Sequence, residues 1–87
     1  MSYRVQFEPA ALKFLRQLRD EKLSQRLIRE IETLQENPRP SGSTKLTGRP
    51  YWRIRVGDYR VLYRIEDDVL VVTVIEIGHR REIYRQP

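Results

Sequence analysis

Hydrophobic and polar residues alternate along four segments of this 87-residue chain, one at the start and three in the second half. At the start, polar residues separate Tyr3, Val5 and Phe7, and a period of two is typical of a strand with one buried face. The later segments, rich in valine, isoleucine and tyrosine, span residues 51–56, 59–66 and 69–77. Short turn sequences separate them, so the pattern predicts an N-terminal strand followed later by an antiparallel meander of three strands.

Between these strands, apolar residues recur at every third or fourth position, which is the period of a helix with one buried side. The first helix is predicted to open at Pro9, because proline is tolerated at the first helical position. The second is predicted over residues 23–36, ending before Pro38, and either Asp20 or Ser24 can cap its start. Its apolar stripe consists of Leu23, Leu27, Ile31 and Leu34.

This order of elements predicts an α+β domain, in which two antiparallel helices and the N-terminal strand pack on an antiparallel sheet of about four strands. Residues 39–49 are rich in glycine, proline and hydroxyl groups and are predicted to be a loop. The chain before this loop is too short to form a core of its own, so the loop is not an interdomain linker and residues 1–87 form one domain. No run approaches the roughly 18 apolar residues of a membrane span. The start of the chain also lacks a signal peptide, and we expect a cytoplasmic protein without membrane contact.

The positive charge of the chain indicates what kind of partner it binds. The formal net charge is +5, and residues 45–60 alone contain five basic residues and one acid. A basic domain of this size often binds a polyanion, and nucleic acid is the commonest one. The chain has no cysteine and one histidine, which argues against a disulfide or a zinc site, and we expect no metal or other cofactor.

The turn Gly57-Asp58 locates the basic residues on the sheet. A two-residue hairpin loop there places Arg55 opposite Arg60, with Arg53 two positions along the same strand. Directly opposed residues share a face, so these arginines lie together, away from the apolar residues that face the helices. The apolar set is Trp52, Ile54, Val56, Val61, Tyr63 and Ile65.

Two arginines directly opposite one another repel, which destabilises a sheet by about a few tenths of a kcal/mol. The stability of the fold therefore does not explain why both positions carry arginine. Guanidinium groups bind phosphate through paired hydrogen bonds and keep their charge, which favours an anion site over solvated arginine stems.

Four segments share a pattern with one known superfamily. They are FEPAALK at residues 7–13, KLTG at 45–48, WRIRVGDYRVLY at 52–63 and GHRREIY at 78–84. In this order they resemble the RelE/ParE toxin superfamily, in particular its RelE-like mRNA interferase branch. The resemblance implies a RelE-like fold and a toxin of a type II toxin–antitoxin system, with a cognate antitoxin protein as partner. It further implies cleavage of mRNA in the ribosomal A site. A ParE-like inhibitor of DNA gyrase and a non-toxic nucleic-acid-binding module are the alternatives.

The resemblance also assigns roles to residues. It implies Arg60, Arg80 and Tyr84 as catalytic residues and Arg53 and Arg55 as a pair that binds RNA phosphates. Lys45 and Arg81 are further candidates for binding phosphate, because their positive charge lies close to this set in the sequence. His79, the single histidine, is a candidate acid or base because its ordinary pKa suits proton transfer.

These residues suit a metal-independent reaction in which the RNA 2′-hydroxyl attacks the adjacent phosphate. Relatives often carry lysine where this chain has Arg53 and Arg55, and arginine keeps its proton, so these two suit phosphate binding rather than proton transfer. Proton removal falls mainly to Tyr84, whose phenolate form is favoured by surrounding cations.

Overall fold

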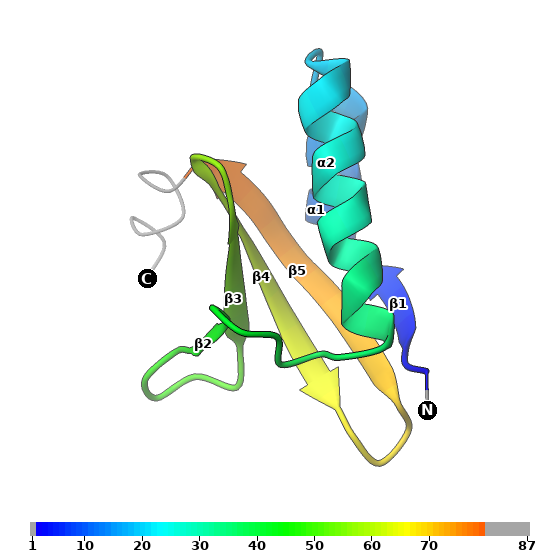
Figure 1. The fold of residues 1–87 in the computed structure, drawn as a ribbon, viewed down its shortest axis with the longest axis vertical. Helices are drawn as coiled ribbons and strands as arrows, with labels where there is room; N and C mark the ends of the chain where they lie inside the picture. The colour runs from blue at the N-terminus through cyan, green and yellow to red at the C-terminus, as the bar shows by residue number, and fades with distance from the viewer. Residues whose placement is uncertain (1, 80–87) are drawn as a thin grey trace.

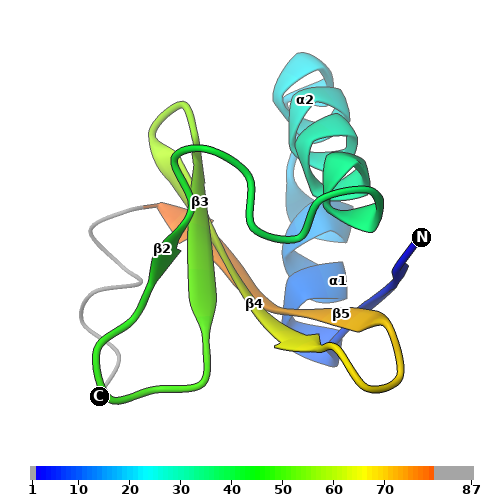
Figure 2. The same cartoon turned by 60° about the horizontal axis from the view of Figure 1, so that its bottom comes forward.

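Two helices lie on one face of a five-stranded sheet in the computed structural model, which describes residues 2–79 (Figure 1). The elements are β1 (Arg4–Phe7), α1 (Pro9–Gln17), α2 (Glu21–Glu32), a 3₁₀ turn (Thr33–Gln35), β2 (Thr44–Lys45), β3 (Trp52–Val56), β4 (Tyr59–Glu66) and β5 (Val71–His79). The strand order is β1-β5-β4-β3-β2, and the turned view of Figure 2 separates the helices from the β3–β4 side of the sheet.

The predicted α+β architecture is confirmed, with two corrections in the sheet. The sheet has five strands because Thr44 and Lys45 pair with β3, inside the segment predicted to be a loop. Two residues are too few to show an alternation that the sequence could reveal. β1 runs parallel to β5, so the sheet is mixed rather than antiparallel. Alternation shows which face of a strand is buried but not the direction of its neighbour.

Both helices begin as their sequences indicate. Pro9 occupies the first turn of α1, and the Asp20 side chain caps α2 by accepting a hydrogen bond from the Leu23 backbone N–H at 3.1 Å. Asp20, rather than Ser24, is therefore the cap, and the helix dipole favours its negative charge there. Neither helix within residues 2–79 is long and apolar enough to cross a membrane.

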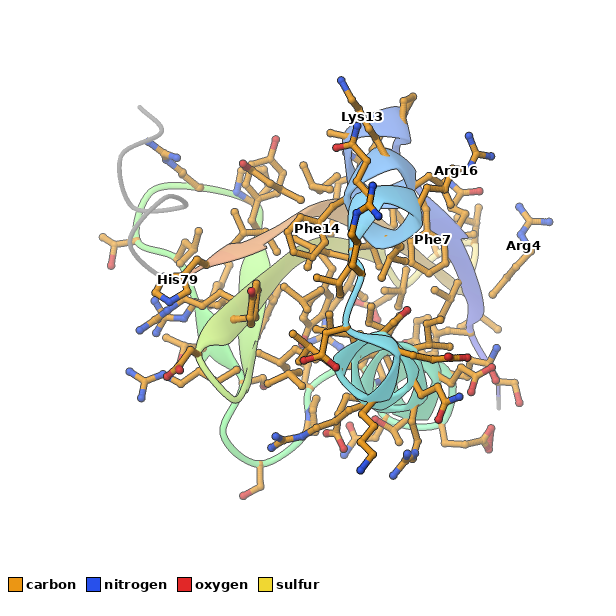
Figure 3. All side chains as sticks on the ribbon, turned by 90° about the horizontal axis from the view of Figure 1, so that it is seen from above. Arg4, Phe7, Lys13, Phe14, Arg16 and His79 are labelled. Carbon is orange, nitrogen blue, oxygen red and sulfur yellow. The ribbon has the colours of Figure 1, made fainter. Side chains whose placement is uncertain are left out.

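The core lies between the helices and the sheet. Its fully buried large side chains are Tyr63, Leu27, Ile31, Leu34, Val56, Val61, Val72 and Val74. Figure 3 shows Phe7 and Phe14 within this layer, whereas Lys13 and Arg16 of α1 point outward. The buried Tyr63 hydroxyl donates to the Pro38 carbonyl at 2.8 Å, and burial raises the pKa of Tyr63 to about 12. This bond ties the segment after α2 to the centre of β4.

A polar cluster at the β4–β5 turn joins three distant parts of the chain. The Arg39 guanidinium donates to both carboxylate oxygens of Asp67, at 3.2 and 2.7 Å, and the Tyr3 hydroxyl donates to Asp67 at 2.6 Å. Arg39 also lies over the Trp52 ring, 5.3 Å from its centroid. The cluster thus connects the N-terminus and the segment after α2 to the turn, at the end of the sheet opposite Gly57.

Asp67 should make the stability of the chain depend on pH. Hydrogen bonds from Arg39 and then Tyr3 hold the pKa of Asp67 below its ordinary value. A depressed folded-state pKa contributes stability above the unfolded pKa, and this stability is lost as pH falls through the folded pKa. We expect the free energy of unfolding to fall more steeply in acid for the wild type than for Asp67→Asn, measured by urea denaturation at low salt. The matched control is Asp68→Asn in the same turn, and equal acid dependence in wild type and Asp67→Asn would contradict the expectation.

Candidate functional site

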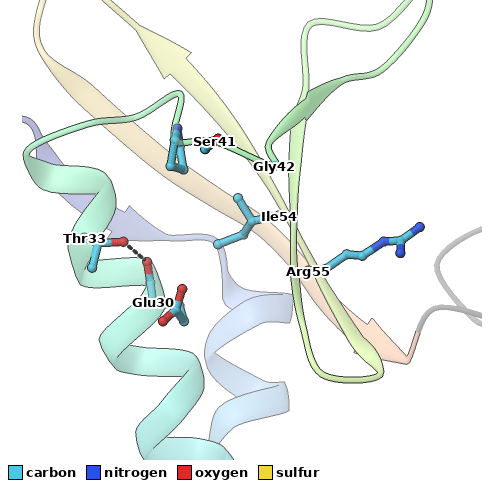
Figure 4. Close-up of a pocket in the computed structure, with 7 residues that line it drawn as sticks. Glu30, Thr33, Ser41, Gly42, Ile54 and Arg55 are labelled. Carbon is cyan, nitrogen blue, oxygen red and sulfur yellow. Dashed lines mark hydrogen bonds between the residues drawn. The ribbon is translucent and has the colours of Figure 1, made fainter.

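The β3–β4 hairpin has the predicted register. Arg55 pairs with Arg60, and Gly57 adopts the left-handed φ of +62° that a tight turn needs and glycine readily supplies. Figure 4 shows Ile54 facing the helix side, toward Glu30 of α2, and Arg55 pointing to the opposite side of β3. The helix-side space between α2 and β3 is a shallow hollow of about 250 Å³. The arginines therefore occupy the face of the sheet that the two helices leave uncovered.

The three arginines differ in exposure. Arg55 is exposed, Arg53 is half-buried, and Arg60 is only 4% exposed. On β5 the partner of Arg60 is Gly78, which has no side chain to occupy the adjacent surface. Taking a guanidinium out of water costs several kcal/mol that its contacts must offset, so these contacts hold the Arg60 side chain in a defined position. We call the surface formed by Arg53, Arg55 and Arg60 the arginine face.

His79 and Lys45 lie on the helix side of the sheet instead. His79 pairs with Tyr59, and their rings meet edge to face with centroids 5.6 Å apart. Tyr59 in turn contacts the Phe14 ring of α1 at 5.8 Å, which identifies this side as the helix side. Lys45 pairs with Trp52, so it shares the Trp52 side rather than that of Arg53. The structure thus brings Arg53, Arg55 and Arg60 together, but not these two residues with them.

Arg80, Arg81 and Tyr84 lie outside the described residues. The end of β5 shows where the chain leads toward them. His79, the last residue of β5, pairs with Tyr59 beside the Gly57-Asp58 turn. The chain therefore leaves the sheet at the end that carries Arg55 and Arg60, as the antiparallel meander predicts.

The sequence pattern missed one carboxylate on the arginine face, that of Glu76. The β4–β5 pairing shifts by one residue: Tyr63 pairs with Val74, but Leu62 pairs with Glu76. This β-bulge places one extra residue of β5 opposite β4, so the alternation of buried residues passes from Val74 to Ile77. Without the bulge, Glu76 would lie on the helix side together with Val74. With it, Glu76 shares the side of Leu62 and Arg60 and is half-buried.

No group of three or more acidic, histidine or cysteine side chains within residues 2–79 is arranged to hold a metal ion. The chemistry that the described site offers is concentrated positive charge with one carboxylate beside it.

Comparisons with known proteins agree over nearly the whole chain. Residues 5–84 match the family described as the ParE toxin of type II toxin–antitoxin system, parDE. The mRNA interferase toxin RelE of Escherichia coli is 32% identical over 91 residues, covering 99% of this chain and 94% of RelE.

Solved structures show the same similarity. A free E. coli RelE carrying two arginine-to-alanine mutations has a TM-score of 0.80 and 31% identity, covering 99% of this chain and 94% of that one. The archaeal RelE–RelB complex from Pyrococcus horikoshii has a TM-score of 0.79 and 28% identity, covering 92% of this chain and 97% of that one. Sequence and fold thus point to the same group of proteins.

Proposed function

Because the chain belongs to the ParE toxin family of type II toxin–antitoxin systems, we propose that it cuts mRNA in the ribosomal A site and so stops translation. The observation that carries the proposal is the Arg55–Arg60 pair on the face of the sheet opposite the helices. A bound phosphate explains two directly opposed arginines, which weaken the sheet. The full-length similarity to an mRNA interferase supports it further. Cleavage would take place in the cytoplasm, where ribosomes translate.

The proposed reaction uses the RNA as its own nucleophile. The 2′-hydroxyl loses its proton and attacks the adjacent phosphorus, the bond from phosphorus to the 5′-oxygen breaks, and a 2′,3′-cyclic phosphate and a protonated 5′-hydroxyl result. The phosphorane that forms on the way carries more negative charge than the starting diester. Fixed cations stabilise it most when they are already in position, and burial holds Arg60 in place. No metal ion or cofactor is needed for these steps.

Further roles are assigned by position and chemistry. Arg80 would join Arg60 at the scissile phosphate, and Tyr84 would take part in proton transfer. Arg81 would contact an RNA phosphate farther from the cut. Lys45, which shares the Trp52 side of the sheet, would contact RNA only where the strand passes the sheet edge at β2. The pairing of His79 with Tyr59 puts its ring on the other side of the sheet, so we assign His79 no proton transfer.

Dependence on the ribosome follows from the size of the site. A small sheet with three clustered arginines offers little grip on a flexible RNA strand. A ribosome that already holds the mRNA in place removes that entropic cost, which can amount to about 7–11 kcal/mol of a barrier in well-oriented reactions.

The proposed partner in the resting cell is a cognate antitoxin protein. Neighbouring folds include RelE bound to RelB, and a toxin of this family must be held inactive until it is needed. With a net charge of +5, the chain would attract an acidic segment.

Primer extension on cellular mRNA tests the proposal. After brief expression of the chain without an antitoxin, we expect discrete cuts within translated codons, and these cuts should vanish when the start codon of the reporter mRNA is removed. The matched control is the double variant Arg53→Ala/Arg55→Ala, which should leave the mRNA intact. Intact mRNA together with broken chromosomal DNA would instead identify a gyrase inhibitor.

A further inference from the structure

The proposed reaction needs a group that removes the 2′-hydroxyl proton, and the three arginines of the arginine face cannot do this. Arginine stays protonated in proteins, so Arg53, Arg55 and Arg60 cannot accept that proton. A phenol is a weak base near neutral pH because its ordinary pKa is about 10. The reaction also needs a second group that gives a proton to the leaving 5′-oxygen.

Glu76 has the position that such a base requires. Arg60 pairs with Gly78, and Glu76 lies two positions away from Gly78 on β5, on the same side of the sheet. Diagonal neighbours of this kind are about 7–8 Å apart at their backbones, within reach of long side chains. Gly78, which is buried, has no side chain to separate Arg60 from Glu76. Across the sheet, Arg53 pairs with Leu62 and Leu62 pairs with Glu76, so a phosphate bound at the arginine face would lie on the same side of the sheet as the half-buried Glu76 carboxylate.

Other described acids are less well placed. Glu66 is on the same face but at the opposite end of β4, where its carboxylate lies 3.7 Å from Arg64. Asp58 is in the β3–β4 turn and lines a hollow on the helix side together with Lys22 and Arg26.

We propose that Glu76 is the general base of the cleavage reaction. Its carboxylate accepts the 2′-hydroxyl proton while the 2′-oxygen attacks phosphorus, and the pair of electrons of the breaking bond leaves with the 5′-oxygen. Water gives a proton to that oxygen and regains one from the protonated Glu76. The charged groups on the same face around Glu76 are Arg60 and Arg64, on either side of its β4 partner Leu62. One strand farther, on β3, they are Arg53, which pairs with Leu62, and Arg55. β1 pairs with β5 only as far as Val74, so it adds no side chain beside Glu76.

The β-bulge gives this assignment a physical reason. Bulges commonly redirect a side chain beside an active site, and here the extra residue turns Glu76 from the covered side of the sheet to the arginine face. A carboxylate next to phosphate-binding arginines weakens anion binding in the ground state. That cost is explained if the carboxylate serves the chemical step.

Single-turnover cleavage on programmed ribosomes tests the base. Glu76→Gln keeps the size of the side chain but cannot accept a proton, and we expect kcat to fall by about 100-fold or more with KM unchanged. The shape of the pH–rate profile should also differ between the two proteins, because only the wild type has a carboxylate that can accept the proton. The matched control, Glu66→Gln, removes a carboxylate from the same face and should cleave at the wild-type rate.

Other outcomes would overturn the inference. These are a wild-type rate in Glu76→Gln, a change in KM alone, or a pH profile of the same shape as that of the wild type. Thermal melting of Glu76→Gln at the wild-type temperature separates lost chemistry from lost folding. The inference rests on the proposed function, and the wild-type reaction separates the two: absence of cleavage by wild-type protein overturns both, whereas cleavage that survives Glu76→Gln overturns only the base.

Discussion

Replacing Arg60 by alanine should slow mRNA cleavage on programmed ribosomes by about 100- to 1,000-fold, the usual loss when one fixed stabilising group is removed from a reaction that builds up negative charge. Arg60 pairs with Arg55 on one side and with Gly78 on the other, so its charge is central to the arginine face. The loss should appear mainly in kcat, because the interaction strengthens as the phosphorane forms. Rates measured at saturating toxin separate this effect from weaker binding.

Controls for Arg60→Ala must address folding, because Arg60 is only 4% exposed and its removal can destabilise the protein. Arg60→Lys keeps the charge but loses the forked geometry, and it should retain more activity than Arg60→Ala. Arg64→Ala removes an arginine from the same strand and the same side, four pairs farther from the turn. It should cleave at the wild-type rate. If Arg60→Ala melts like the wild type and still cleaves at its rate, Arg60 has no role in the chemistry.

The second large effect concerns stability. Leu27→Ala should lower the free energy of unfolding by about 2–5 kcal/mol, the range found when a buried leucine is truncated and a cavity remains. Leu27 is 0% exposed and belongs to the core cluster beneath α2. The free energy of unfolding of a small domain is about 5–15 kcal/mol in total, so the variant should lose a large share of it and melt at a lower temperature. Chemical denaturation measures the change in midpoint.

The control for Leu27→Ala is Leu12→Ala on α1. Leu12 is 37% exposed, so the same truncation removes less buried surface and should cost much less. Equal losses for the two variants would mean that α2 does not cover the core as described. Because α2 lies on the opposite side of the sheet from the arginine face, any Leu27→Ala that remains folded should still cleave mRNA.

The arginine cluster was predictable from the sequence because it depends on a local feature. The turn Gly57-Asp58 sets the pairing of the residues on either side of it, and the alternation of β3 and β4 then determines which side each residue takes. The two helices were predictable for a similar reason, since their apolar period and their caps lie within the segments themselves.

Three features required the tertiary structure, since each arises where segments far apart in the chain meet. These are the parallel pairing of β1 with β5, the 4% exposure of Arg60 and the side of the sheet on which Glu76 lies. The last is the most consequential for function. By itself, the sequence determined the helices, the hairpin and the arginines of one face, because periodicity and turn chemistry act over a few residues. The side of Glu76 was decided only by the bulge, because the register of a ladder is set jointly by its two strands.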